Sequence, residues 1–147
     1  MIEQYADQYS IPLVGLLALG QAESGWRRTA ERWGIWPDVS FGSTQITVRL
    51  AAAYGIGDGT EASALVVRDA LFDRETAIRL GADYYAQGLA RAAAMFSGLE
   101  GDALLLQGLI AYNSGSPQPE GNWYWQDWSG NIASYRAALV WAHGIVG

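Results

Sequence analysis

Residues 11–26 read IPLVGLLALGQAESGW, and this stretch decides the fold. Pro12 suits the first position of a helix, with Ser10 as its cap. The residues that follow are apolar nearly all round, so the sequence predicts a buried helix. Polar residues come only at its end, where Glu23 and Ser24 precede a glycine that favours a helix stop. The apolar run is too short and too interrupted by glycine to span a bilayer.

A second stretch repeats this pattern, because residues 101–115 read GDALLLQGLIAYNSG. It predicts another mostly apolar helix that ends in Tyr112 and Asn113. Two buried helices that both end in polar residues indicate two walls of one cleft. The alternative for Asn113 is a purely structural one, in which it caps its helix in a left-handed conformation.

The rest of the chain carries further helical patterns and few strand signals. Further helices are expected at residues 2–10, 45–54, 61–71, 74–96 and 131–143. Residues 27–44 read as a loop with turn signals, and they leave room for at most a small β-hairpin near residues 33–44. The sequence therefore predicts a mainly α protein, organised as a single domain over residues 1–147.

Composition excludes several classes of function. The chain has 147 residues, a net charge of −6, no cysteine and one histidine, and all nine basic residues are arginine. An acidic chain lacks the basic surface of a nucleic-acid binder. Without cysteine or lysine it has no thiolate nucleophile, no cysteine-ligated zinc and no Schiff base. With a single histidine, the two-histidine helix of a metalloprotease is excluded. We expect no metal and no cofactor.

Glu23 is the most informative single residue. It lies at the C-terminal end of a buried helix, where both the helix dipole and the apolar surroundings disfavour a charged carboxylate. Both effects raise its pKa above the ordinary value of about 4.3. A carboxylic acid that stays protonated near neutral pH can act as a general acid. The alternative is a structural carboxylate paired with Arg27 or Arg28.

An aromatic cluster occupies residues 121–128, which read GNWYWQDW. Flat aromatic rings with polar edges suit the C–H faces of sugars, so Trp123 and Trp125 are candidate sugar contacts. The alternative is a small core under a long loop, with the indole N–H groups bonded locally.

Four motifs occur in an order and at a spacing that resemble a known family. They are Glu23-Ser24-Gly25-Trp26, then Phe41-Gly42-Ser43-Thr44-Gln45, then Ile78-Arg79-Leu80-Gly81-Ala82-Asp83-Tyr84-Tyr85, then Ala111-Tyr112-Asn113-Ser114-Gly115. Together they resemble the soluble lytic transglycosylase domain of glycoside hydrolase family 23, which is related to goose-type lysozyme. The resemblance extends over about residues 5 to 140.

The resemblance implies a lysozyme-like, mostly helical fold and a set of site residues. Glu23 matches the catalytic acid/base of the family. The substrate-binding positions that it implies, together with the aromatic candidates above, are Ser24, Gly42, Ser43, Gln45, Tyr112, Asn113, Tyr135, Trp123 and Trp125. Three positions depart from the family pattern. Ser43-Thr44 stands where the family has Leu-Met, and Arg32 stands where it often has serine.

The activity implied is cleavage of the bond from N-acetylmuramic acid to N-acetylglucosamine in peptidoglycan, with one acid acting twice and 1,6-anhydromuramic acid as product. One alternative is a goose-lysozyme-type hydrolase, in which Asp38 is the candidate second carboxylate that activates water. The two carboxylates of such an inverting enzyme would lie roughly 6.5–9.5 Å apart. Another alternative is a non-catalytic wall-binding module of a phage virion.

We expect the partners to be peptidoglycan glycan strands, with no nucleic acid and no membrane insertion, and we expect a monomer. The sequence MIEQYADQYS has neither the basic nor the apolar region of a signal peptide. The expected setting is therefore the bacterial cell wall, reached as a phage-released or virion-associated enzyme or as part of a larger chain.

Overall fold

Apolar residues around Leu16 and Leu109 form the two buried helices that the sequence predicts, α2 (Leu13–Ser24) and α6 (Gly101–Ser114). The computed structural model describes all 147 residues, Met1–Gly147. It contains eight α-helices, one short 3-10 turn and three short strands. The prediction of a mainly α fold with a small hairpin is confirmed.

Five other helices lie close to the predicted ranges: α1 (Ile2–Gln8), α3 (Val48–Ala53), α4 (Ala64–Leu71), α5 (Arg74–Met95) and α8 (Ser129–Val146). A 3-10 turn, η1 (Glu61–Ser63), precedes α4. The short helix α7 (Trp123–Asp127) was not predicted, because it lies in the aromatic cluster that was expected to be a loop. The strands are β1 (Glu31–Trp33), β2 (Val39–Phe41) and β3 (Ile46–Thr47). They form one antiparallel sheet in the order β1-β2-β3.

Two local predictions were wrong. Ser10 does not cap α2, because it has a φ of 54° in the turn that ends α1 and its backbone N–H donates to Asp7. The helix expected over residues 45–54 begins only at Val48, because the two residues before it pair with β2 as a strand. Thr47 is the actual cap of that helix, since its hydroxyl accepts a hydrogen bond from the Leu50 N–H at 3.1 Å.

The chain folds into two compact units, and the boundary crosses two helices. Unit 1 consists of Met1 and Glu23–Gly81, and unit 2 consists of Ile2–Ala22 and Ala82–Gly147. The boundary therefore falls near the end of α2 and within the second turn of α5. Because unit 2 contains both Ile2–Ala22 and Ala82–Gly147, no single cut of the sequence separates the units. The single domain expected over residues 1–147 remains a prediction.

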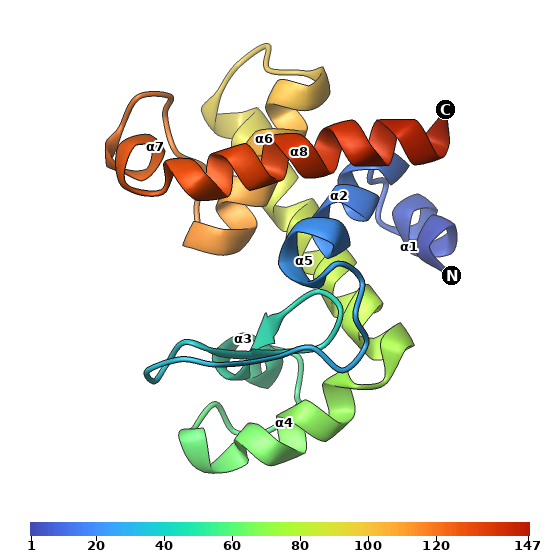
Figure 1. Cartoon of the computed structure of the whole chain (residues 1–147), viewed down its shortest axis with the longest axis vertical. Helices are drawn as coiled ribbons and strands as arrows, with labels where there is room; N and C mark the ends of the chain where they lie inside the picture. Colours follow the sequence, from blue (N-terminus) through green and yellow to red (C-terminus); the bar gives the residue numbers. More distant parts are fainter. The chain divides into compact units, whose positions relative to one another are not determined.

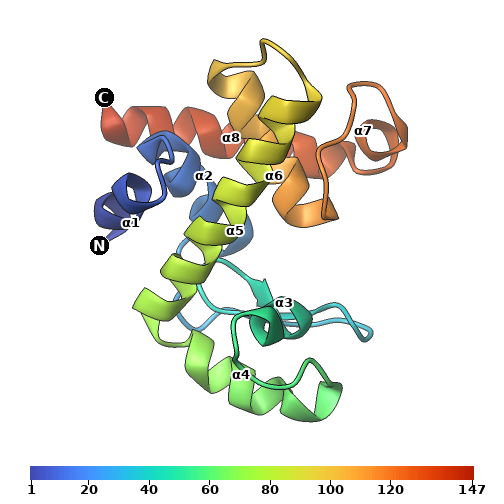
Figure 2. The same cartoon turned by 180° about the vertical axis from the view of Figure 1, so that it is seen from behind.

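Unit 1 is built around the small sheet, and α3 and α4 lie beside it (Figure 2). All three residues of β2 are buried, whereas β1 is exposed. The start of α5 is fixed to the sheet's turn by Thr44, whose hydroxyl donates to the Ala77 carbonyl at 2.7 Å. Gly81 makes this approach feasible, because a Cβ there would lie 2.7 Å from the Thr44 side chain.

Unit 2 has a helical core in which α6 and α8 lie side by side and α7 packs at the beginning of α8 (Figure 1). Tyr85 of α5 is fully buried there, and its hydroxyl donates to the Leu105 carbonyl at 3.1 Å. The Tyr85 side chain packs against Gly15 and Gly108, and a Cβ at either glycine would lie within 2.8 Å of that side chain. These close contacts fix the packing of α2, α5 and α6 within the unit.

Candidate active site

The predicted site residues fall into two groups, one in each unit. Unit 1 holds Glu23, Ser24, Asp38, Gly42, Ser43 and Gln45, and unit 2 holds Tyr112, Asn113, Trp123, Trp125 and Tyr135. Each group has its own geometry, and the two are described in turn.

Glu23 is the penultimate residue of α2, and the helix ends directly after it because Gly25 and Trp26 both have a φ of 62°. The side chain as a whole keeps partial exposure, but its carboxyl group is desolvated. Burial raises the pKa of Glu23 to about 7, against the opposing effect of the Arg32 charge. The group has no ion pair with Arg27 or Arg28, so the structural alternative is wrong. Such a carboxyl can both donate and accept a proton near neutral pH.

Ser24 joins the end of α2 to the turn that follows β2. Its hydroxyl donates to the Ser43 carbonyl at 2.6 Å and accepts from the Arg27 N–H at 3.1 Å. The Arg27 side chain in turn donates from Nε to the Ser24 carbonyl at 2.9 Å. Ser24 is buried, and its bonds position the backbone next to Glu23.

The turn of residues 42–45 is held from within by Gln45, which has a φ of 51°. Its carboxamide nitrogen donates to the carbonyls of Gly42 at 3.0 Å and Ala30 at 3.3 Å, and its oxygen accepts from the Ser40 hydroxyl at 3.0 Å. Both N–H donors of Gln45 are therefore engaged within the fold. Gln45 therefore stabilises the turn. Its side chain has no free N–H donor with which to make the predicted contact with substrate.

Gly42 and Ser43 are likewise buried parts of the turn. Gly42 has a φ of 82°, and a Cβ there would lie 2.6 Å from the Leu71 carbonyl oxygen. Ser43 is fully buried, and its hydroxyl is the one buried side-chain polar atom without a hydrogen-bond partner. Because the side chain has no exposed surface, the prediction that it contacts substrate is not realised in this arrangement. An unpaired buried hydroxyl costs about 1–3 kcal/mol.

Asp38 lies in the loop of the β1-β2 hairpin, and its carboxylate forms an ion pair with Arg32 at 2.9 Å. Both side chains are more than half exposed, at 52% and 58%. The hairpin brings them together because Gly34 donates its N–H to the Asp38 carbonyl at 2.8 Å. Arg32 thus bears on both candidate carboxylates, as the partner of Asp38 and as the charge that lowers the pKa of Glu23.

In unit 2, Asn113 is exposed and oriented, whereas Tyr112 is buried. The Asn113 side-chain oxygen accepts from the Tyr124 hydroxyl at 2.8 Å and from the Asn131 amide at 3.3 Å. No hydrogen bond within the chain uses its NH₂ group. Gly115, with a φ of 88°, is the left-handed cap of α6, so the capping alternative for Asn113 is wrong.

Tyr112 and Tyr135 are both buried, the first on α6 and the second on α8. The Tyr112 ring packs at a tilt against Tyr84, with 5.2 Å between the ring centroids. Tyr84 carries the Arg91 guanidinium on its ring at 6.0 Å, and Arg91 donates to the Gly115 carbonyl at 2.6 Å. The end of α6 is therefore anchored to α5 behind the exposed Asn113.

The two predicted tryptophans of α7 serve different surfaces. Trp123 is 55% exposed and meets the Tyr124 ring edge-on, and Trp128 is stacked on the same ring at 6.4 Å. Tyr124 donates a hydrogen bond to Asn113, so the exposed rings of Trp123 and Trp128 lie on the same side chain that contacts Asn113. We call Asn113, Tyr124, Asn131 and these two rings the Asn113 surface. Trp125 instead donates its indole N–H to the Gln118 carbonyl at 3.0 Å and lines a separate cavity.

Sequence reasoning placed Tyr124 and Trp128 in the aromatic cluster but did not connect them with Asn113, and it missed Asn131. It also grouped Trp123 with Trp125, which the helix α7, with about 3.6 residues per turn, directs to different surfaces. Nothing in the local sequence around Asn131 indicates a role in binding. Its connection to the site is a hydrogen bond to Asn113, which lies 18 residues away in the chain.

Comparison of the sequence with the profiles of known protein families returns no match, and a search among curated proteins finds none that is significantly similar. No group of three or more acidic, histidine or cysteine side chains is placed to hold a metal ion. None of the helices combines the length and apolarity needed to cross a membrane. A functional assignment therefore depends on the motifs and on the geometry of the two groups.

Proposed function

We propose that the chain is a peptidoglycan lytic transglycosylase that cleaves the bond from N-acetylmuramic acid to N-acetylglucosamine and leaves 1,6-anhydromuramic acid ends. The observation that carries the proposal is Glu23, a carboxyl at the end of an apolar helix whose pKa burial raises to about 7. Near neutral pH this group is divided between its acid and its carboxylate form, and a one-residue acid/base needs both.

In the proposed reaction, Glu23 first gives its proton to the glycosidic oxygen, and the bond from that oxygen to the muramoyl C1 breaks. The N-acetyl group of the substrate stabilises the positive charge that develops at C1. The Glu23 carboxylate then takes the proton of the muramoyl C6 hydroxyl, whose oxygen bonds to C1 and closes the anhydro ring. Glu23 ends the cycle protonated, and neither water nor a cofactor is consumed.

The Asn113 surface supports the proposal as a place for sugar rings. The Asn113 NH₂ group offers a hydrogen bond to a carbonyl or hydroxyl oxygen, such as that of an N-acetyl group. Trp123 and Trp128 offer exposed ring faces of the kind that pack on sugar C–H groups.

The hydrolase alternative assigns the second role to Asp38. Its Oδ2 is bonded to the Arg32 guanidinium at 2.9 Å, which leaves Oδ1 able to accept a proton from water, so the chemistry of the products has to distinguish the two reactions. The alternative of a wall-binding module gives no reason to keep a carboxyl desolvated at the end of α2. We propose that the protein acts as a monomer on glycan strands of the bacterial wall, as a phage-released or virion-associated enzyme.

The experiment that tests this function compares two glutamine variants on purified peptidoglycan. Because general acid–base catalysis contributes about 10²–10⁴-fold, Glu23→Gln should lower the rate of wall cleavage by that factor while the fold is retained. The control is Glu61→Gln, which removes the same charge from an exposed position of η1 and should keep the wild-type rate. A Glu23→Gln protein that retains most of the rate, or a wild type that releases no fragments, would overturn the proposal.

A further inference from the structure

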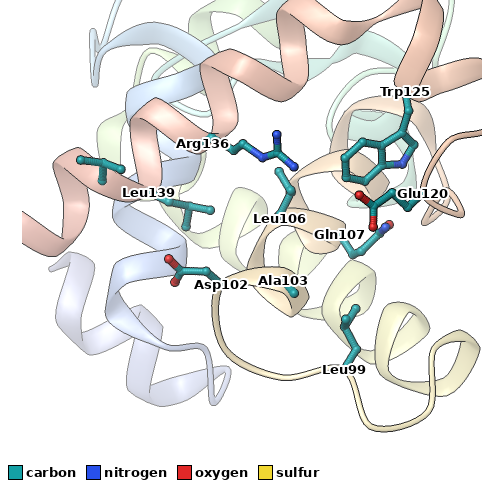
Figure 3. A pocket seen from close by; sticks show the side chains of 10 residues that line it. Leu99, Asp102, Ala103, Leu106, Gln107, Glu120, Trp125, Arg136 and Leu139 are labelled. Carbon is teal, nitrogen blue, oxygen red and sulfur yellow. The ribbon is translucent and has the colours of Figure 1, made fainter.

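A cavity of about 460 Å³ lies within unit 2, between α6, α8 and α7 (Figure 3). Its size is within the roughly 300–1,000 Å³ range of small-molecule sites. Neither Asn113 nor Trp123 lines it, so it is distinct from the Asn113 surface. Its lining residues are Leu99, Asp102, Ala103, Leu106, Gln107, Glu120, Trp125, Arg136, Leu139 and Val140.

Arg136 is the cationic group of this cavity. Its guanidinium lies over the Trp125 ring at 5.6 Å and points into the cavity in Figure 3. It makes no ion pair and no side-chain hydrogen bond within the chain. A guanidinium stacked on a ring keeps its N–H edge free, and that edge matches a carboxylate with two parallel hydrogen bonds.

The Trp125 ring on which Arg136 lies is positioned by hydrogen bonds within the unit. Gln107 and Gln118 are both buried and bond each other twice, at 2.8 and 3.0 Å, through side chain and backbone. The Trp125 indole donates to the same Gln118 carbonyl at 3.0 Å. The aromatic platform under Arg136 is therefore fixed before any ligand binds, which lowers the entropic cost of binding.

Glu120 is the free anionic group of the cavity. The other lining acid, Asp102, is already bonded to His143 at 2.8 Å, whereas Glu120 forms no ion pair. Figure 3 shows the Glu120 and Arg136 side chains reaching into the same space. Leu106 and Leu139 contribute apolar side chains to the rest of the lining.

We propose that this cavity binds a short peptide that carries both a free carboxylate and a free amine, with small apolar side chains. The carboxylate pairs with Arg136, the amine pairs with Glu120, and the side chains contact Leu106 and Leu139. A neutral sugar would offer hydrogen bonds but no opposite charge to either group. A phosphate ester would meet one cation and two acids, so its net charge does not fit. The inference goes beyond the proposed glycan cleavage and does not depend on Glu23.

Calorimetric titration with alanyl-alanine tests the site directly. The dipeptide is used in its L,L and D,D forms, each free, N-acetylated or C-amidated. We expect at least one free form to bind, and both blocked forms of that isomer to bind about tenfold more weakly, because each loses one charge pair with the protein. A preference for the D,D form assigns the ligand to wall peptides, and a preference for the L,L form assigns it to ordinary protein fragments.

Two variants assign the contacts. Arg136→Gln should weaken binding of the free dipeptide about tenfold, and C-amidation should then weaken binding no further. Glu120→Gln should also weaken binding of the free dipeptide about tenfold, and N-acetylation should then weaken it no further. Both residues are exposed, so the fold should persist. The matched control is Arg68→Gln, which removes an arginine that also lies over an aromatic ring, at 5.9 Å from Phe72, but outside the cavity. Absence of binding by either free isomer, or equal binding by wild type and Arg136→Gln, would overturn the proposal.

Discussion

The residues around Glu23 and the residues around Asn113 are organised in opposite ways. In unit 1, the polar side chains of Ser24 and Gln45 form hydrogen bonds with other residues of the same unit. In unit 2, Asn113 is held by two bonds to its oxygen, and no hydrogen bond within the chain uses its NH₂ group. Around it, Trp123 and Trp128 expose large parts of their rings.

Under the proposed function, this difference separates the reacting carboxyl from the surface that binds sugars. A pKa near 7 on Glu23 requires desolvation, and desolvation requires that nearby polar groups be satisfied internally. Sugar recognition requires the reverse, because a ligand can bond only donors and ring faces that the fold leaves unused. The two regions therefore respond differently to mutation.

The largest expected effect on stability comes from a matched pair of glycines. Gly42 and Gly121 share a φ of 82°, but a Cβ at Gly42 would lie 2.6 Å from the Leu71 carbonyl, whereas nothing lies within 4 Å at Gly121. Both alanine variants lose about 1–2 kcal/mol to left-handed strain. Gly42→Ala adds overpacking of about 1–3 kcal/mol. Denaturant unfolding checks this, and equal losses in the two variants would mean that the turn is not packed as described.

A smaller effect concerns stability against pH. In the folded protein Glu23 releases its proton near pH 7, whereas in the unfolded chain it does so near pH 4.5. The folded state therefore binds more protons in this window, and the stability that Glu23 contributes is full below pH 4.5 and lost as the pH rises to about 7.

Relative to Glu23→Gln, the wild type should lose about 2 kcal/mol of unfolding free energy across that window, a figure discounted for the partial exposure of the side chain. Urea unfolding of both proteins at pH 4 and pH 8 measures the difference. Parallel pH profiles for the two proteins would mean that the carboxyl is solvated.

The smallest expected effect is on binding at the Asn113 surface. In a Glu23→Gln background, which does not consume the ligand, Trp123→Ala and Asn113→Ala should each weaken a chito-oligosaccharide about fivefold to tenfold, corresponding to about 1 kcal/mol. The melting temperature of Trp123→Ala should change little, because that side chain is exposed. Asn113→Ala also removes the acceptor of the Tyr124 hydroxyl and the Asn131 amide, so its melting temperature should fall and its binding is compared per folded molecule. Trp141→Ala, from an exposed position of α8, is the control. A collapse of stability with unchanged binding would favour the alternative of an aromatic core.

Helices were predictable from the sequence because their signals are local. The apolar run before Glu23 and the run before Asn113 each define a helix and its end. The strands were harder to predict. β3 has only two residues and forms by pairing with β2, and the local pattern of residues 45–54 does not indicate this pairing. Ser10 was misread since a serine before proline looks like a cap, whereas the turn after α1 requires a left-handed residue there.

The candidate site was predictable as a set of positions, but not as a set of roles. Glu23 stood out because the position of a carboxyl along an apolar helix is readable from sequence. The bracing role of Gln45 depends on Ala30 and Ser40, which reach it only through the sheet. The separation of Trp125 from Trp123 likewise depends on the direction of each ring on α7, and on the Gln118 carbonyl that holds one of them.

The mass of the products released from purified peptidoglycan tests the central claim most directly. If Glu23 acts alone and directs the muramoyl C6 hydroxyl to C1, no water is added, and the muropeptides carry 1,6-anhydromuramic acid ends. Hydrolysis would instead add one water, about 18 Da, because the acid/base then directs solvent to the same carbon. We expect anhydro products from the wild type and from Asp38→Asn alike. Products with reducing ends only, together with loss of activity in Asp38→Asn, would contradict the account and assign the second role to Asp38.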